Sequence, residues 1–161
     1  MMIRKNAPVA AVAFVALALF LLWLWKPERQ VRLHTSHFLK NVERRNWDRA
    51  RDFLAPGYTD RWQHDRDTAM GDAREAFRQF LFLTVENHTD SCDMDGDHAT
   101  AHTVVRISGS GGPVAQLVME RVNDLHSPFL FVWHKASWKP WDWELERVDH
   151  PELSAERFGG F

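Results

Sequence analysis

Hydrophobic residues follow three successive patterns along this chain. From Ala7 to Trp25 no residue is charged or strongly polar. From about residue 28 to residue 80, apolar residues recur at three- and four-residue spacing, which predicts amphipathic helices. From about residue 81 the spacing changes to two, and β-branched and aromatic residues become frequent, which predicts strands. Helices followed by a strand meander predict an α+β domain whose helices cover one face of a strongly curved antiparallel sheet.

Three helices are expected in the second part, at about residues 28–45, 47–55 and 67–80. Asn46 is a good N-cap for the second helix, and Asp67 or Thr68 for the third. The faces expected to be buried are Val31, Thr35, Phe38, Leu39 and Val42 in the first helix, Trp47, Ala50 and Leu54 in the second, and Ala69, Met70, Ala73, Ala76, Phe77 and Phe80 in the third.

Five strands are expected in the third part, at about residues 82–93, 97–108, 113–124, 128–136 and 140–149. Their short connections require antiparallel neighbours. The fourth strand is apolar on both faces, with Phe129, Phe131 and Trp133 on one face and Leu130, Val132 and His134 on the other. A strand covered on both faces needs a second cover besides the helices. We expect a second copy of the chain, which would give a homodimer through the sheet, with a C-terminal segment as the alternative cover.

The apolar segment 7–25 is expected to be a transmembrane helix, with the lipid bilayer as its partner. As a helix it would be about 28 Å long, close to the roughly 30 Å of a hydrocarbon core. Basic and aromatic residues flank it, namely Arg4, Lys5, Trp23, Trp25, Lys26 and Arg29. The alternative is a signal peptide cleaved after Ala16-Leu17-Ala18, which would leave a strongly apolar new N-terminus. We expect the domain outside the cytoplasm, in the periplasm if the protein is bacterial.

Length and charge restrict the organisation further. The 161 residues divide into a tail at 1–6, the helix at 7–25, one domain at 26–150 and a tail at 151–161. With a formal net charge of -2 and no basic stripe, nucleic acid is excluded as an expected partner. The single cysteine, Cys92, excludes an internal disulfide and a cysteine-based zinc cage.

The stretch SCDMDGDHATAH, from Ser91 to His102, has the acidic spacing of a calcium loop. A calcium loop would need a bidentate glutamate at its twelfth position, where His102 stands, and helical flanks. The flanks here alternate as strands. Asp95-Gly96 instead fits a two-residue type I′ turn, which predicts a hairpin that pairs Met94 with Asp97 and Asp93 with His98.

Three stretches together resemble the nuclear transport factor 2-like superfamily: NWDRARDFLAPGY in the helices, DGDHATAHTVV in the hairpin and WKPWDWELERVD in the last strand. The resemblance covers about Glu28 to Asp149. It implies a cone in which helices close on a bent sheet, often around an apolar pocket, and a tendency to dimerise through the sheet. The superfamily includes ketosteroid isomerase, scytalone dehydratase, polyketide cyclases, transport adaptors and the extracytoplasmic domains of single-span secretion-assembly proteins. Its fold therefore does not select one function.

Five residues are candidates for a site in such a pocket. Tyr58, the only tyrosine, and Glu120 are the candidate acid and base of an isomerase-like site. His102 and His134 are the candidate pair of a dehydratase-like site. Trp62 belongs to a set of tryptophans that would line a pocket for a lipid, a sterol-like molecule or another apolar ligand, or would simply fill the core.

No nucleophile elbow, phosphate-binding glycine loop or HExxH helix is present, and we expect neither a metal nor a cofactor. The sequence therefore favours a membrane-anchored, non-catalytic interaction or assembly domain. The alternative is a protein that binds a small apolar ligand, or an isomerase- or dehydratase-like enzyme, that uses the pocket. A closed, tryptophan-filled interior would favour the first function, and an open pocket would favour the second.

Overall fold

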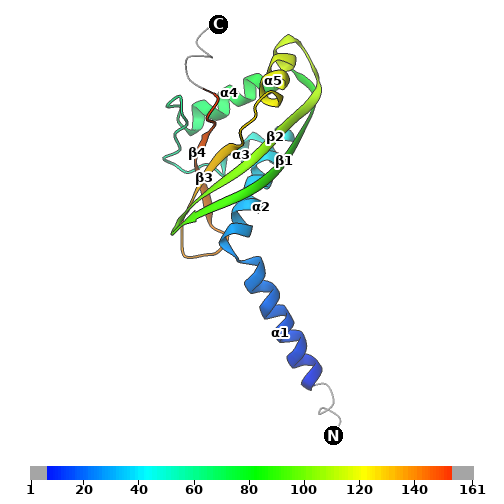
Figure 1. Ribbon diagram of the computed structural model, residues 1–161, viewed down its shortest axis with the longest axis vertical. Helices are drawn as coiled ribbons and strands as arrows, with labels where there is room; N and C mark the ends of the chain where they lie inside the picture. Colours follow the sequence, from blue (N-terminus) through cyan, green and yellow to red (C-terminus); the bar gives the residue numbers. More distant parts are fainter. Residues whose placement is uncertain (1–6, 154–161) are drawn as a thin grey trace.

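The computed structural model describes residues 7–153, and Figure 1 shows the arrangement of their helices and strands. In chain order the elements are α1 (Ala7–Leu24), α2 (Pro27–Glu43), α3 (Trp47–Arg51), α4 (Arg66–Arg78), β1 (Phe80–Asp95), β2 (His98–Gly111), α5 (Pro113–Asn123), β3 (Phe129–Lys135) and β4 (Trp143–Asp149). The strands form one antiparallel sheet in the order β1-β2-β3-β4. The long β1–β2 hairpin is bowed, and α1 projects from the end of the domain opposite α4 and α5 (Figure 1). The predicted α+β class is confirmed.

The core lies between α2 and the inner face of the sheet. The stripe predicted for the first helix is confirmed, because Val31, Thr35, Phe38, Leu39 and Val42 are all buried on α2. Trp133 on β3 is fully buried, and its Nε1–H donates to Thr35 Oγ1 over 3.0 Å. Thr35 Oγ1 in turn donates to the Val31 carbonyl oxygen over 2.9 Å. The buried indole and hydroxyl therefore satisfy each other, as buried polar groups must.

The strand predicted at residues 113–124 is wrong, because this segment forms the helix α5. Val118, Glu120 and Val122 alternate with period two, but Ala115, Val118, Met119 and Val122 also share one face of a helix, and these four residues are the ones that pack toward the core. Pro113 occupies the first turn, where its fixed φ and missing N–H favour a helix start. The sheet consequently has four strands rather than five.

The hairpin is confirmed, but its predicted register is wrong by one residue at the turn. Asp95 pairs with His98, which leaves Gly96 and Asp97 as the two turn residues. Gly96 alone has a positive φ, at 59°, as in a type II′ rather than a type I′ turn. Ala99, Ala101 and Thr103 of β2 are buried in this register.

Two helix boundaries also differ from their predictions. The N-cap of α4 is Asp65, whose side chain accepts a hydrogen bond from the Thr68 N–H over 2.8 Å. The second helix ends at Arg51 instead of continuing to residue 55. Leu54 leaves the helix to form a bridge with Leu145 on β4, so pairing with the sheet replaces the last helical turn.

The segment predicted to span a membrane is helical as α1. Across the described part of the chain, no single helix has both the length and the hydropathy of a membrane span; one pair, Ala11–Leu24 with Pro27–Glu43, reaches them together, with a bend of 64° between its halves. Passage through a bilayer stays a prediction.

Candidate functional site

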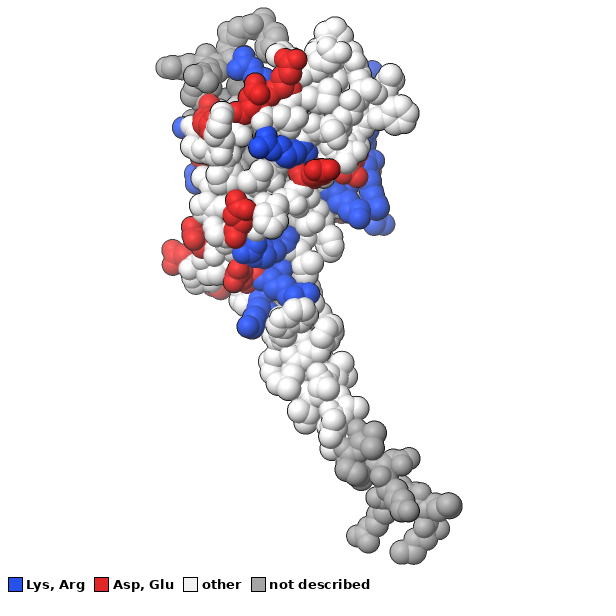
Figure 2. All heavy atoms as spheres, turned by 45° about the vertical axis from the view of Figure 1, so that its right-hand side comes forward, with Lys and Arg blue, Asp and Glu red and all other residues white. Residues whose placement is uncertain are grey.

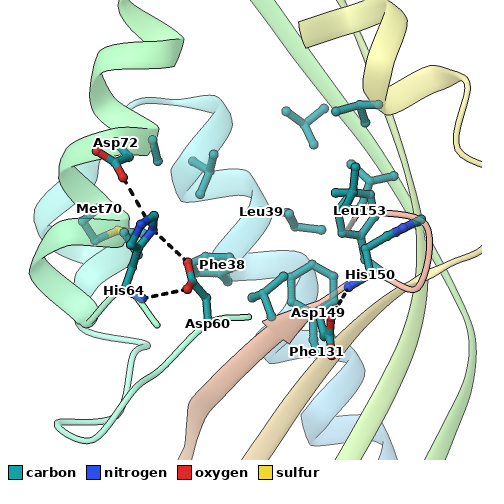
Figure 3. A pocket seen from close by; sticks show the side chains of 18 of the residues that line it. Phe38, Leu39, Asp60, His64, Met70, Asp72, Phe131, Asp149, His150 and Leu153 are labelled. Carbon is teal, nitrogen blue, oxygen red and sulfur yellow. Dashed lines mark hydrogen bonds and ion pairs between the residues drawn. The ribbon is translucent and has the colours of Figure 1, made fainter. Parts of the chain in front are cut away.

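An apolar cavity of about 480 Å³ lies between the helices and the inner face of the sheet. Its volume falls within the range of about 300–1,000 Å³ that is typical of small-molecule pockets. It is lined by Phe38, Leu39, Val42, Tyr58, Asp60, Trp62, His64, Ala69, Met70, Asp72, Ala73, Phe77, Val85, Val105, Ile107, Val122, Phe129, Phe131, Val148, Asp149, His150 and Leu153. Figure 3 shows these walls, with α4 on one side and the strands on the other.

The apolar wall of the cavity follows from the spacing of residues in each element. Phe38 and Leu39 point from α2, one turn beyond the buried Thr35. Val105 and Phe131 are inward positions of β2 and β3, where every second residue is buried. Met70 on α4 closes the opposite side (Figure 3). Because α4 has no fully buried residue, it lies beside the cavity rather than filling it.

A histidine between two carboxylates forms one polar edge of the cavity. His64 Nδ1 lies 3.2 Å from Asp60 Oδ2 and 3.5 Å from Asp72 Oδ2 (Figure 3). The Asp60 side chain is only 8% exposed, and its Oδ1 accepts the backbone N–H groups of Trp62 and His64, each over 2.9 Å. The Asp60 carboxylate therefore contacts both the backbone of residues 62–64 and the imidazole ring of His64. None of the described residues hydrogen-bonds to His64 Nε2.

The opposite polar edge is already occupied by internal hydrogen bonds. His150 Nδ1 accepts the Glu152 N–H over 3.1 Å, so Nε2 carries the proton and donates to the Ser127 carbonyl oxygen over 2.8 Å. Asp149 Oδ1 accepts from Arg61 over 3.3 Å and from the His150 N–H over 2.7 Å. Both ring nitrogens of His150 are thus used in internal hydrogen bonds, whereas His64 lines the cavity with its Nδ1 alone held by carboxylates.

Two of the five candidate residues, Tyr58 and Trp62, line the cavity. Tyr58 is buried, and this burial, together with the nearby Asp60 carboxylate, raises the pKa of its hydroxyl above the ordinary value. The hydroxyl therefore stays protonated and can only act as a neutral hydrogen-bonding group at physiological pH. The Trp62 ring lies beside the His64 ring, with 6.4 Å between centroids and 29° between the ring planes.

The other three predicted residues lie outside the cavity. His102 is on the outer face of the sheet, with Nε2 2.8 Å from Asp93 Oδ2. His134 is on the same outer face, with Nδ1 3.5 Å from Glu146 Oε1. Glu120 is exposed on α5, because the segment is a helix rather than a strand. The predicted pair of His102 and His134 and the predicted base Glu120 are therefore wrong as pocket residues.

Asp60, His64 and Asp72 were not among the residues predicted from the sequence. For Asp60 and His64 a signal was present in the stretch TDRWQHDRD directly after Tyr58, in which carboxylates surround one histidine, whereas Asp72 lies further along, on α4. Asp60 and His64 lie in the connection before α4, which has no periodicity, so no pattern of burial showed which side chains face the pocket. Within residues 7–153, no group of three His, Cys, Asp or Glu side chains is arranged to hold a metal ion.

No protein-family model matches the chain, and no curated protein matches it. Solved structures resemble it in fold. A protein of the NTF2-like family from Streptomyces avermitilis, provisionally described as a dehydratase, has a TM-score of 0.55 at 14% identity, with 74% of this chain and 91% of that chain covered. An NTF2-like protein of unknown function from Pseudomonas putida has a TM-score of 0.55 at 12% identity, with 75% and 82% covered.

Bd1075 from Bdellovibrio bacteriovorus has a TM-score of 0.54 at 12% identity; the likeness covers 79% of this chain but only 42% of that protein. Identities this low show the fold alone. The domain has the nuclear transport factor 2-like fold that the sequence resemblance implied.

Proposed function

We propose that this domain binds one small, largely apolar molecule in the cavity between α2, α4 and the sheet. The observation that carries the proposal is the cavity itself, about 480 Å³ with an apolar wall and a polar edge. A well-packed core leaves few voids larger than a water molecule, so a space of this size is not a packing defect. Between the alternatives that the sequence left open, the cavity supports ligand binding over a purely structural interior.

The polar groups restrict the chemistry of the ligand. Asp60, Asp72 and Asp149 place three carboxylates around the cavity, and Arg61 is the cation that pairs with one of them. A ligand carboxylate or phosphate would face this negative charge at short range. In the neutral ring, His64 Nδ1 carries the proton toward the two carboxylates, so Nε2 is an acceptor that suits a ligand hydroxyl. The proposed ligand is therefore a neutral molecule with a long or fused apolar body and one hydroxyl group.

Anchoring to a membrane through α1 is the second part of the proposal. The described side chains of α1 leave their apolar surface uncovered: Val12, Phe14, Val15, Leu17, Leu19, Phe20 and Leu22 are each more than half exposed. A continuous apolar surface of this kind needs a cover. The absence of any charge between Ala7 and Trp25 favours hydrocarbon as that cover. The basic residues before and after the segment are closely balanced and do not set its orientation, so the placement of the domain outside the cytoplasm stays a prediction.

The test of ligand binding is native mass spectrometry of the full chain released from detergent, after incubation with equal concentrations of dodecanol, dodecanoate and dodecylamine. We expect adducts of one ligand per chain, with the alcohol exceeding the carboxylate by about tenfold, the ratio produced by about 1.4 kcal/mol. Absence of any adduct would contradict the binding function. A preference for dodecanoate would contradict the role given to the three carboxylates.

Proton transfer to a bound ligand is a second candidate function, because Asp60 and His64 stand 3.2 Å apart in the wall of the pocket. A carboxylate that orients an imidazole is a common device of general acid–base catalysis. The provisional description of the Streptomyces avermitilis protein as a dehydratase is compatible with it. Exchange of the α-hydrogens of a long-chain methyl ketone in heavy water tests this function. The wild type should accelerate exchange and His64→Gln should not; equal rates would remove the candidate.

An interaction role through the outer face of the sheet, with homodimerisation, stays a prediction. Leu130 and Val132 on that face are half-buried within the single chain. The neighbouring His134 and Glu146 are polar. Sedimentation of the full chain in detergent would detect the dimer.

A further inference from the structure

Two tryptophans lie on the surface at the end of the domain nearest α1. Trp138 is 84% exposed and Trp141 is 51% exposed, and both belong to residues 136–142, which connect β3 to β4. Neither residue lines the cavity. Large exposed aromatic side chains are uncommon on soluble surfaces, whereas tryptophan is enriched where one end of the ring is apolar and the other is wet.

The connection lies directly beside the end of α1. The rings of Trp141 and Trp25 are 6.1 Å apart between centroids, at 52°. Trp25 follows the last residue of α1, whose carbonyl oxygen accepts a hydrogen bond from Gln30 Nε2 over 2.7 Å. The start of α2 and the β3–β4 connection are therefore held at the same level as the end of the apolar helix, as Figure 1 shows.

The connection is ordered by its own hydrogen bonds, so the exposure of Trp138 is built into the fold. The Ala136 N–H donates to the Asp142 carbonyl over 2.9 Å, and the Asp142 N–H donates to the Lys139 carbonyl over 3.3 Å. Trp143 Nε1 donates to the Pro140 carbonyl over 3.1 Å. This turn presents the Trp138 ring outward instead of folding it against the sheet.

Basic side chains also lie at the end of the domain nearest α1. Lys26 follows Trp25, and the Arg29 guanidinium lies 3.4 Å from the centroid of the Trp23 ring. Figure 2 shows Lys and Arg side chains gathered where α1 joins the domain, with acidic side chains beside them. The acidic β1–β2 turn is close, because the Lys135 N–H donates to the Asp97 carbonyl over 2.8 Å. The charge at this end is mixed, so the tryptophans rather than net positive charge define the surface.

We propose that residues 136–142 form a second contact with the bilayer that holds α1, with Trp138 and Trp141 at the level of the lipid headgroups. This inference rests on the proposed anchoring of α1. Tryptophan is enriched at membrane–water interfaces, where its ring lies at the level of the headgroups. The domain then sits against the membrane surface instead of swinging on a free tether. In this arrangement α4, which lines one side of the cavity, lies at the end of the domain far from α1 (Figure 1).

The test uses the full chain with Cys92→Ser, reconstituted in phosphatidylcholine vesicles that carry a doxyl quencher high in the acyl chain. An environment-sensitive fluorophore is attached at Lys139→Cys, beside Trp138, and in a matched control at Gln116→Cys, which is exposed on α5. We expect the label at 139 to lose about half of its fluorescence and the label at 116 to lose none, because only the first lies at headgroup depth. When Trp138→Ser and Trp141→Ser are introduced into the variant labelled at position 139, its fluorescence should be restored.

Carbonate extraction of the same vesicles tests the anchoring of α1 separately from the proposed contact of residues 136–142. If the protein resists extraction but the labels at 139 and 116 are quenched equally, the second contact is wrong and the anchor stands. If quenching at 139 survives loss of both tryptophans, the role given to these rings is wrong. If carbonate releases the protein, the anchor fails and the inference fails with it.

Discussion

At the scale of single residues, the pair of Thr35 and Trp133 determines how α2 sits on the sheet. Thr35 was predicted to face the core from the spacing of apolar residues along the helix. Its partner could not be predicted, because the hydrogen bond joins residues 98 positions apart in the chain. Periodicity identifies which side chains are buried, whereas the partner across the core depends on the strand register.

We expect Thr35→Val to lower the free energy of unfolding by about 1–3 kcal/mol, because it leaves the buried Trp133 indole N–H without an acceptor. Denaturant titration of the two variants Thr35→Val and Trp133→Phe, and of the double variant, measures the coupling. If the single and double effects simply add, the two side chains do not interact and the contact assigned to them is wrong.

His34 gives the domain a pH dependence near neutrality. Burial, opposed in part by a hydrogen bond with the Gln30 carbonyl, lowers the pKa of His34 below its ordinary value. As pH falls through the unfolded value of about 6.5, the unfolded chain takes up a proton that the folded chain still excludes, so stability decreases from that pH downward.

We therefore expect His34→Gln to unfold with a shallower loss of stability than the wild type between about pH 7 and pH 5. Thermal melts at several pH values measure the slope. His37→Gln, one turn away on the exposed face of α2, is the control. Parallel slopes for wild type and His34→Gln would show that His34 is not the group responsible.

At the scale of elements, α5 is the segment for which the spacing of apolar residues gave a wrong prediction, a strand instead of a helix. Both a strand and a helix fit residues 113–124, because apolar residues there satisfy period two and the helical period. What decides is the junction with β2. The Asn123 side chain accepts the Ile107 N–H over 2.9 Å and donates to the Ile107 carbonyl over 2.7 Å, which fastens the end of α5 to the strand. This pairing depends on residues far from the segment itself.

The β2–α5 junction also depends on one glycine. A Cβ atom on Gly111 would overlap the Gln79 carbonyl oxygen and lie 2.7 Å from Ala115 Cβ, whereas the nearest atom to a Cβ on Gly112 would be 3.7 Å away. We expect Gly111→Ala to cost about 1–3 kcal/mol of stability, as overpacking does. Gly112→Ala is the matched control, and denaturant titration compares them. Equal stability of both variants would contradict the packing described for the junction.

At the scale of the whole molecule, the sequence predicted the α+β architecture and the resemblance to the nuclear transport factor 2-like fold, and the structure confirms both. Of the five candidate pocket residues, Tyr58 and Trp62 line the cavity, and both belong to the connection between α3 and α4. His102 and His134 do share one face of the sheet, but it is the outer face. Alternation along a strand shows which residues share a face and does not show which face meets the helices.

Fluorescence of N-phenylnaphthylamine tests the central claim, an accessible apolar pocket, most directly. The probe is titrated into the full chain in detergent, using wild type, Ala73→Trp and Arg74→Trp. Ala73 lines the cavity on α4, and Arg74 is its exposed neighbour outside the lining. Ala73→Trp should abolish saturable binding, and Arg74→Trp should retain it. The non-saturable fluorescence of probe dissolved in the micelles should be the same for wild type and both variants. Loss of binding in neither variant, or in both, would contradict a ligand site in this cavity.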